Sequence, residues 1–169
     1  MAILTVLWEK WVEFRRDWLQ ITLSSLVSPL LYILTFGLGL GQALAVDGRA
    51  YLDFLLPGVV ALTTMNSSFN AIGMSLNVQR LYEHSFDNIM ISPTPMWQYI
   101  LGQMTAGSLR GMYAGCLVIA VGLCFGASMT FDPMFFVVML LNGMTFASLG
   151  VLAAVLSKTH AGISRFSSF

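Results

Sequence analysis

The segment RLYEHSFDNIMISPTPMW, from Arg80 to Trp97, is the longest polar interruption in an otherwise apolar chain. The chain has 169 residues, of which 57% are hydrophobic and 9% are charged. Soluble domains carry roughly 25% charged residues, and a chain of this length cannot bury so much apolar surface in a soluble core. The sequence therefore predicts an integral membrane protein whose apolar segments lie in a lipid bilayer.

Uncharged stretches recur on both sides of this polar segment. A transmembrane helix needs about 20 mostly apolar residues to cross roughly 30 Å of hydrocarbon. On this basis we predict complete transmembrane helices at 20–41, 55–76, 98–126 and 134–156, and the start of a fifth near Phe166. The expected fold class is an all-α integral membrane bundle with four complete transmembrane helices.

The basic residues of the connecting segments gather on one side of these helices. Six of them lie in the N-terminal, 77–97 and 157–165 segments: Lys10, Arg15, Arg16, Arg80, Lys158 and Arg165. The 42–53 and 127–132 loops contain only Arg49. Because cytoplasmic loops are enriched in Lys and Arg, we predict a plasma or inner membrane protein with a cytoplasmic N-terminus. The net charge is zero, so nothing in the charge balance indicates a nucleic acid partner.

Residues 4–19, LTVLWEKWVEFRRDWL, have the period of an amphipathic helix. The apolar face comprises Leu4, Leu7, Trp8, Trp11, Val12, Trp18 and Leu19, and the polar face comprises Glu9, Lys10, Glu13, Arg16 and Asp17. Tryptophans on one face favour a helix that lies in the plane of the membrane interface. A simple cytoplasmic lead-in to the first span is the alternative.

The polar segment itself predicts a helix over residues 80–92. Its apolar face comprises Tyr82, Phe86, Ile89 and Met90, and its opposite face comprises Glu83, His84, Asp87 and Asn88. Ser92 precedes a proline and therefore ends the helix. Glu83 and Asp87 are four residues apart and repel each other, which a cationic partner would relieve. The residues alone leave two interpretations open, a docking surface or a solvated amphipathic loop.

Arg110 is a charged residue inside the third predicted span. An arginine at the bilayer centre costs between ~2.5 and more than 10 kcal/mol, so it must face protein, water or a partner group. We identify no acid at that depth in the predicted spans. The candidate partners are another subunit, a part of the protein outside this chain, or the polar residues Asn66 and Asn70. Both an interhelical anchor and a direct role in a substrate path are open.

Glycines recur every four residues around Arg110, at Gly107, Gly111 and Gly115. Such rows allow two membrane helices to approach closely, so we predict a packing face on this helix.

The sequence contains no HExxH or CxxC motif. The nearest approach to a phosphate-binding loop, LSKTH, lacks the required glycines. We therefore expect no catalytic residue, metal or cofactor in this chain, and any ATP hydrolysis would occur on a partner.

The order of these features resembles the permease subunit of ABC-2-type exporters, which include the nodulation lipo-oligosaccharide and daunorubicin-resistance permeases. The matching features are the amphipathic N-terminal helix, YLDFLLPGVV at Tyr51–Val60, the helical segment ending in ISPTP, LRG in the third span and SKTHAGISRFSSF after the fourth. The resemblance covers the whole chain. Since such permeases have six spans, it implies that this sequence is truncated at the start of the fifth.

The resemblance also implies partners. Such permeases form homodimers or heterodimers and bind two cytoplasmic ATPase subunits, which hold ATP and Mg. A coupling helix between the second and third spans fits a groove on the ATPase. The residues of this chain that map to it are Tyr82, Glu83, His84, Phe86 and Asp87. The N-terminal helix, 4–19, corresponds to the family's interface helix.

Two functional hypotheses follow. The first is a permease subunit of an ATP-driven exporter that moves an amphipathic substrate, such as a lipid, a lipid-linked glycan or a drug, out of the cytoplasm. The second is a membrane scaffold or anchoring subunit with no transport path, which the short chain and the glycine rows favour.

Overall fold

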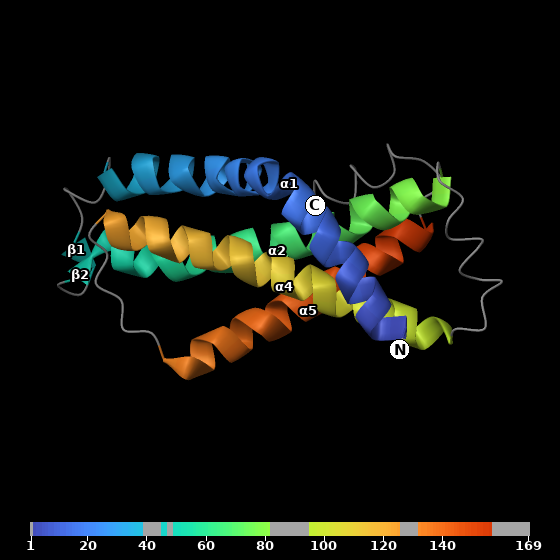
Figure 1. Cartoon of the computed structure of the whole chain (residues 1–169). Helices are drawn as coiled ribbons and strands as arrows, with labels where there is room; N and C mark the ends of the chain where they lie inside the picture. Colours follow the sequence, from blue (N-terminus) through green and yellow to red (C-terminus); the bar gives the residue numbers. More distant parts are fainter. Residues whose placement is uncertain (1, 39–44, 47–48, 82–94, 126–131, 157–169) are drawn as a thin grey trace.

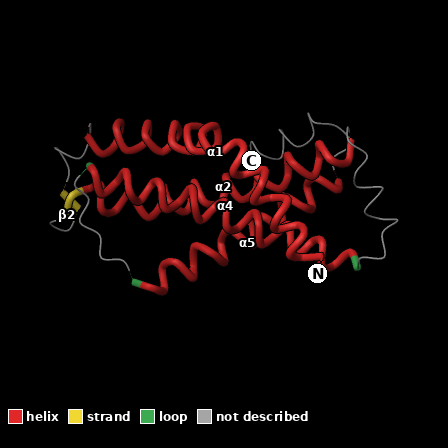
Figure 2. Tube along the Cα trace, viewed as in Figure 1, coloured by secondary structure: helices red, strands yellow, loops and turns green. Residues whose placement is uncertain are grey.

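The computed structural model describes residues 2–38, 45–46, 49–81, 95–125 and 132–156 (Figure 1). The described residues form the long helices α1 (Ala2–Tyr32), α2 (Tyr51–Leu81), α4 (Met96–Cys124) and α5 (Pro133–Leu156). A short π-helix, η1 (Ile33–Leu38), continues α1. The strands β1 (Ala45–Val46) and β2 (Arg49–Ala50) pair as an antiparallel hairpin. Helices dominate the described chain, as the all-α expectation requires (Figure 2).

Helix α1 contains both the predicted interface helix and the start of the first predicted span. It bends at Asp17, whose φ of −108° and ψ of 18° are not helical. The part before the bend, residues 2–16, crosses the bundle obliquely, and the part after it runs along α4 (Figure 1). We call residues 2–16 the N-terminal segment. No loop separates it from the following span.

Three described helices are long and apolar enough to cross a membrane: Thr5–Thr35, Met96–Cys124 and Pro133–Leu156. Helix α2, which contains the predicted span 55–76, is as long as α1 but is not among these three, and it is less apolar than α4 and α5. It packs mainly against α4 and α5, and its buried side chains include Thr63, Thr64, Ser68 and Asn77. These polar groups face protein rather than lipid, so α2 can be less apolar than its neighbours. That α2 spans the membrane stays a prediction, and the expected fifth span lies outside the described residues.

Helix α2 extends further at both ends than its predicted span. It begins at Tyr51, and Asp53 lies in its first turn. An acidic residue in the first turn stabilises a helix. It ends at Leu81, so the structure assigns Arg80 and Leu81 to α2 and not to a separate coupling helix. The rest of the predicted coupling helix lies outside the described residues.

Helices α2, α4 and α5 cross one another at close range near the middle of the bundle (Figure 1). A Cβ atom at Gly107 would lie 2.5 Å from Cγ1 of Ile72, and one at Gly111 would overlap Oγ of Ser68. From α5, a Cβ atom at Gly143 would lie 3.1 Å from the same Ser68 oxygen. We call this contact the small-residue crossing; its members are Ser68, Gly107, Gly111, Gly115 and Gly143. Only residues without a side chain allow the backbones to come this close.

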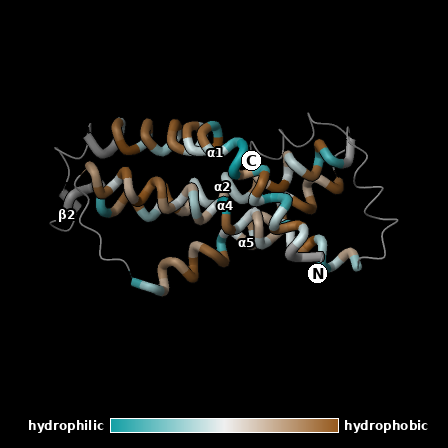
Figure 3. Tube along the Cα trace, in the orientation of Figure 1, coloured by the Kyte–Doolittle hydropathy of each residue, from teal (hydrophilic) through white to brown (hydrophobic). Residues whose placement is uncertain are grey.

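An apolar cluster lies on each side of the crossing. One comprises Ile33, Leu56, Val59, Val60, Val118, Ile119 and Met139, and the other comprises Val6, Ala71, Ile72, Leu76, Tyr99, Ala147 and Ala154. Many large apolar side chains are also exposed, and apolar residues predominate along much of the helices (Figure 3). Along α1, for example, Leu19, Leu23, Val27 and Leu31 are exposed at four-residue intervals. An apolar outer surface is what a bilayer requires of its protein.

The crossing predicts opposite effects of the same substitution at two glycines. Gly111→Ala places a methyl group on Ser68, and we expect overpacking to destabilise the protein by about 1–3 kcal/mol. At Gly58 of α2 a Cβ atom meets nothing within 4 Å, so Gly58→Ala should be neutral or stabilise by up to about 1 kcal/mol. Thermal unfolding in detergent measures both. Equal midpoints for the two variants would disprove the close contact.

Candidate coupling site

The N-terminal segment packs on the bundle through part of its polar face, with Lys10 and Glu13 partly buried and Glu9, Arg16 and Asp17 exposed. Lys10 Nζ donates hydrogen bonds to Ser75 Oγ of α2 and, at 2.7 Å, to Glu13 Oε2. The Lys10 side chain is only 10% exposed and the Glu13 side chain is 39% exposed, so the lysine end of this ion pair is shielded from solvent. In contrast, Trp8 and Trp11 on the other face are 69% and 58% exposed. Lys10 therefore packs on protein, and Trp8 and Trp11 leave most of their surface free to meet the membrane.

A chain of hydrogen bonds connects the N-terminal segment to α2 and α4. Gln79 Nε2 donates to Glu9 Oε1 at 2.8 Å, and Gln79 Oε1 accepts from the Tyr99 hydroxyl at 3.1 Å. Gln103 Nε2 donates to the same hydroxyl at 3.0 Å. Gln79 lies near the end of α2 and Tyr99 near the start of α4. The network therefore joins the two helix ends that flank residues 82–94 to each other and to α1.

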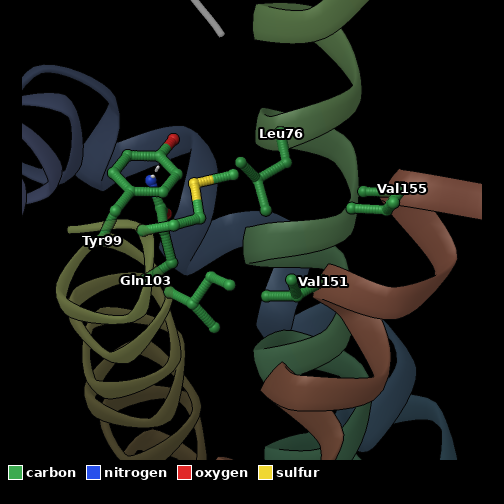
Figure 4. A pocket seen from close by; sticks show the side chains of 8 residues that line it. Leu76, Tyr99, Gln103, Val151 and Val155 are labelled. Carbon is green, nitrogen blue, oxygen red and sulfur yellow. Dashed lines mark hydrogen bonds between the residues drawn. The ribbon is translucent and has the colours of Figure 1, made fainter. Parts of the chain in front are cut away.

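The inner end of this network borders a small cavity between α2, α4 and α5 (Figure 4). Its volume is about 30 Å³, and Leu76, Tyr99, Gln103, Val151 and Val155 are among its lining residues. Gln103 is fully buried, and its Oε1 has no hydrogen-bond partner among the described residues. An unpaired buried polar atom costs about 1–3 kcal/mol, so the Gln103 carbonyl oxygen lowers the stability of the folded protein.

Other buried polar atoms on α2 are also unpaired within the described part of the chain. They are Oγ of Ser68 and both side-chain amide atoms of Asn77. Both residues are fully buried. Since buried polar groups are usually paired, α2 carries an unusual number of unmet hydrogen bonds for one helix.

Arg110 lines a second, larger pocket between the N-terminal segment, α2 and α4. Its volume is about 380 Å³. The lining residues are Leu7, Lys10, Trp11, Glu13, Phe14, Ala71, Ile72, Ala106, Leu109, Arg110 and Tyr113. The Tyr113 ring packs edge-to-face on Phe14 at 5.0 Å, and its hydroxyl lies 3.0 Å from Thr22 Oγ1. These contacts hold α1 against α4 on both sides of the bend at Asp17.

The structure supplies acids for Arg110 that the sequence interpretation missed. The charges of Glu13 and Asp17, both in α1, act on its guanidinium, although no described acid forms a direct ion pair with it. The proposed partners Asn66 and Asn70 are instead exposed on α2, and neither lines the pocket. We missed the acids because we did not expect the polar face of residues 4–19 to pack on the bundle. The four-residue spacing of Glu13 and Asp17, which puts both on the polar face of residues 4–19, was the sequence pattern that could have indicated them.

Arg110 lies at the middle of α4, between Gly107 and Gly111 of the small-residue crossing. Helix α4 has 29 residues, a length of about 44 Å, which exceeds the roughly 30 Å of a hydrocarbon core. The N-terminal segment, with its exposed tryptophans, lies beside the part of α4 that contains Arg110. Tryptophan favours the headgroup level, so Trp11 brings an interfacial type of side chain to the pocket that Arg110 lines.

The remaining predicted site residues fall into two groups. Gly107, Gly111 and Gly115 lie where α4 contacts α2, as the small-residue crossing shows. The proposed coupling residues Tyr82, Glu83, His84, Phe86 and Asp87 lie outside the described residues. Within the described ranges, no group of His, Cys, Asp or Glu could hold a metal ion.

The whole chain, residues 1–169, matches the ABC-2 type transporter family, and the chain belongs to that family. It is a multi-pass membrane protein. The inner membrane transport permease YadH of Escherichia coli (strain K12) is 25% identical over 166 residues, which cover 96% of this chain and 64% of YadH. Nodulation protein J of Rhizobium meliloti (strain 1021) is 28% identical over 166 residues, with 90% and 62% coverage.

Nodulation protein J of Neorhizobium galegae is 29% identical over 143 residues, which cover 82% of this chain and 53% of that protein. The chain therefore spans less than two thirds of the length of these relatives. No solved structure gives a significant match.

The hydrogen-bond network predicts a non-additive pair of substitutions. Tyr99→Phe leaves the buried Gln103 amide without its partner, and we expect a loss of about 1–3 kcal/mol. Adding Gln103→Met, which is similar in volume and apolar, should restore most of this stability because no orphaned amide remains. Unfolding midpoints of the single and double variants in detergent test this. Additive losses would show that the two side chains do not act as a pair.

Proposed function

We propose that the chain is the N-terminal part of a permease subunit of an ATP-driven exporter in the inner membrane. Membership of the ABC-2 type transporter family and similarity to a protein named as an inner membrane transport permease support this proposal. The substrate we propose is amphipathic, such as a lipid, a lipid-linked glycan or a drug, and it leaves the cytoplasm. ATP and Mg bind to a separate ATPase subunit, and a second permease copy completes the transporter.

The observation that carries the mechanism is the Glu9–Gln79–Tyr99–Gln103 network. An ATPase that docks on residues 83–91 pushes on the end of α2 and the start of α4 together, because Gln79 and Tyr99 are hydrogen-bonded to each other. Gln79 also holds Glu9, so the same movement reaches the N-terminal segment. That segment is closely seated on α4, where a Cβ atom at Gly102 would lie 3.1 Å from Val6.

The bend at Asp17 gives the N-terminal segment a place to pivot. A residue with non-helical φ and ψ interrupts the hydrogen bonding that stiffens a helix. Beyond the bend, Thr22 contacts Tyr113 of α4, so the following span keeps its place while the segment moves. In this mechanism the chain transmits force and performs no hydrolysis.

The excess of basic residues around the N-terminus and the 77–97 segment supports a cytoplasmic location for both. The same location brings residues 83–91 within reach of a cytoplasmic ATPase. The acidic face of this predicted helix, with Glu83 and Asp87, suits a basic groove, and the apolar face with Tyr82 and Phe86 suits an apolar one.

Charge reversal tests the docking role. Glu83→Lys with Asp87→Lys should weaken co-purification with the cognate ATPase at least tenfold, which corresponds to about 1.4 kcal/mol of binding free energy. Asp47→Lys, in the loop predicted to face the other side, is the control and should bind normally. Unchanged association and transport in the double variant would rule out docking through this acidic face.

A non-transporting anchoring subunit is the second candidate, and the rigid small-residue crossing favours it. The two functions differ in one measurement. An exporter subunit loses substrate transport when the Glu83 and Asp87 charges are reversed, whereas an anchor recruits the ATPase but supports no transport even as the wild type.

A further inference from the structure

We propose that the 380 Å³ pocket beside Arg110 binds the headgroup of an anionic phospholipid. This inference goes beyond the proposed transport function, since it concerns a lipid bound between the N-terminal segment and the bundle. It rests on the charge balance of the pocket, the chemistry of its walls and its position.

The pocket lining has an excess of positive charge. Two cations, Lys10 and Arg110, and one acid, Glu13, line it. Glu13 is already paired with Lys10 at 2.7 Å. Asp17 also acts on Arg110, but it lies outside the pocket lining and is exposed, so water and ions weaken its effect.

Arg110 is the cation that remains available to a ligand. No direct ion pair occupies its guanidinium among the described residues, and its side chain is only partly exposed. A guanidinium presents several N–H donors in one plane, a geometry that matches a phosphate group. One negative charge balances the lining, and the phosphate of an anionic phospholipid such as phosphatidylglycerol carries one.

The walls of the pocket indicate an amphiphile rather than free phosphate. Apart from Lys10, Glu13 and Arg110, the lining is aliphatic or aromatic, including Phe14 and Ile72. A volume of about 380 Å³ is within the roughly 300–1,000 Å³ usual for ligand sites. It has room for a phosphate with its glycerol and the first carbons of the acyl chains.

The pocket also lies where a bilayer lipid can enter. Two of its lining residues, Trp11 and Leu109, are 58% and 55% exposed, so the pocket reaches the outer surface of the bundle. The exposed tryptophans of the N-terminal segment favour the headgroup level of the membrane. A phospholipid there places its phosphate beside Arg110 and its acyl chains along the apolar outer surface.

A bound lipid would add a further bridge between two parts of the protein that already pack together through Phe14 and Tyr113. Its phosphate would contact Arg110 of α4, and its glycerol and proximal acyl carbons would pack on Trp11 and Phe14 of the N-terminal segment. A ligand that binds only the folded protein stabilises it, so the protein should unfold at a higher temperature with the lipid present.

The experiment is a thermal-unfolding titration of the detergent-purified protein with phosphatidylglycerol, phosphatidylcholine or soluble glycerol 3-phosphate. We expect phosphatidylglycerol to raise the unfolding midpoint well above the effect of the other two. Arg110→Gln should weaken this response at least tenfold in lipid concentration, and Arg110→Lys should retain part of it. Arg15→Gln, which removes an exposed cation of the N-terminal segment outside the pocket, is the matched control and should respond as the wild type.

A second variant keeps the test informative if Arg110→Gln does not fold. Ala106→Leu adds volume to the pocket without altering any charge, and it should abolish the response to phosphatidylglycerol. An equal response to phosphatidylcholine would overturn the proposal in favour of non-specific lipid contact. An equal response to glycerol 3-phosphate would replace the lipid with a free phosphate ligand. A full response in both pocket variants would place the lipid elsewhere. None of these readouts depends on an ATPase or on transport.

Discussion

The backbone contact of α2, α4 and α5 around Ser68 is the constraint on which the rest of the structure depends. In a bilayer, apolar helices gain little from leaving lipid, so close packing and interhelical hydrogen bonds must hold them together. Gly111 and Gly143 allow such packing because each brings a bare backbone to the Ser68 side chain. Once these axes are fixed, the apolar clusters on either side fill the space between them. The helix ends are then placed where Gln79 can meet Tyr99.

Polar side chains are concentrated inside this protein and at one end of it. Helix α2 carries buried Thr64, Ser68 and Asn77 because it lies between neighbours and contacts little lipid. The N-terminal segment extends the same pattern, since Glu9 and Lys10 bond to α2 and Trp8 is largely exposed. The bundle is therefore apolar outside and partly polar within, the reverse of a soluble protein of similar size. This arrangement explains both the composition of α2 and the charged pocket beside Arg110.

Much of the fold follows from the sequence, because long uncharged stretches can hardly form anything but helices in lipid. The bounds of α4 and α5 lie within two residues of the predicted ones. The continuity of α1 was not predictable from periodicity, since the change from amphipathic to wholly apolar sequence suggested two separate elements. The acids near Arg110 were missed for a similar reason. Glu13 is far from Arg110 in the chain, and only the tertiary path of α1 brings them together.

The Gln79–Tyr99 hydrogen bond has a consequence for the conformational entropy of the segment between them. These residues are 20 positions apart, and their contact closes the intervening chain into a loop anchored at both ends. The conformational entropy of bringing positions 79 and 99 together is therefore lost when the bundle folds, before any partner binds. For the docking that we propose, a segment whose two ends are already held together has fewer conformations to lose than a free tail, and this favours binding. In the proposed mechanism, Tyr99 therefore contributes to the affinity for the ATPase although it lies outside the proposed docking residues 83–91.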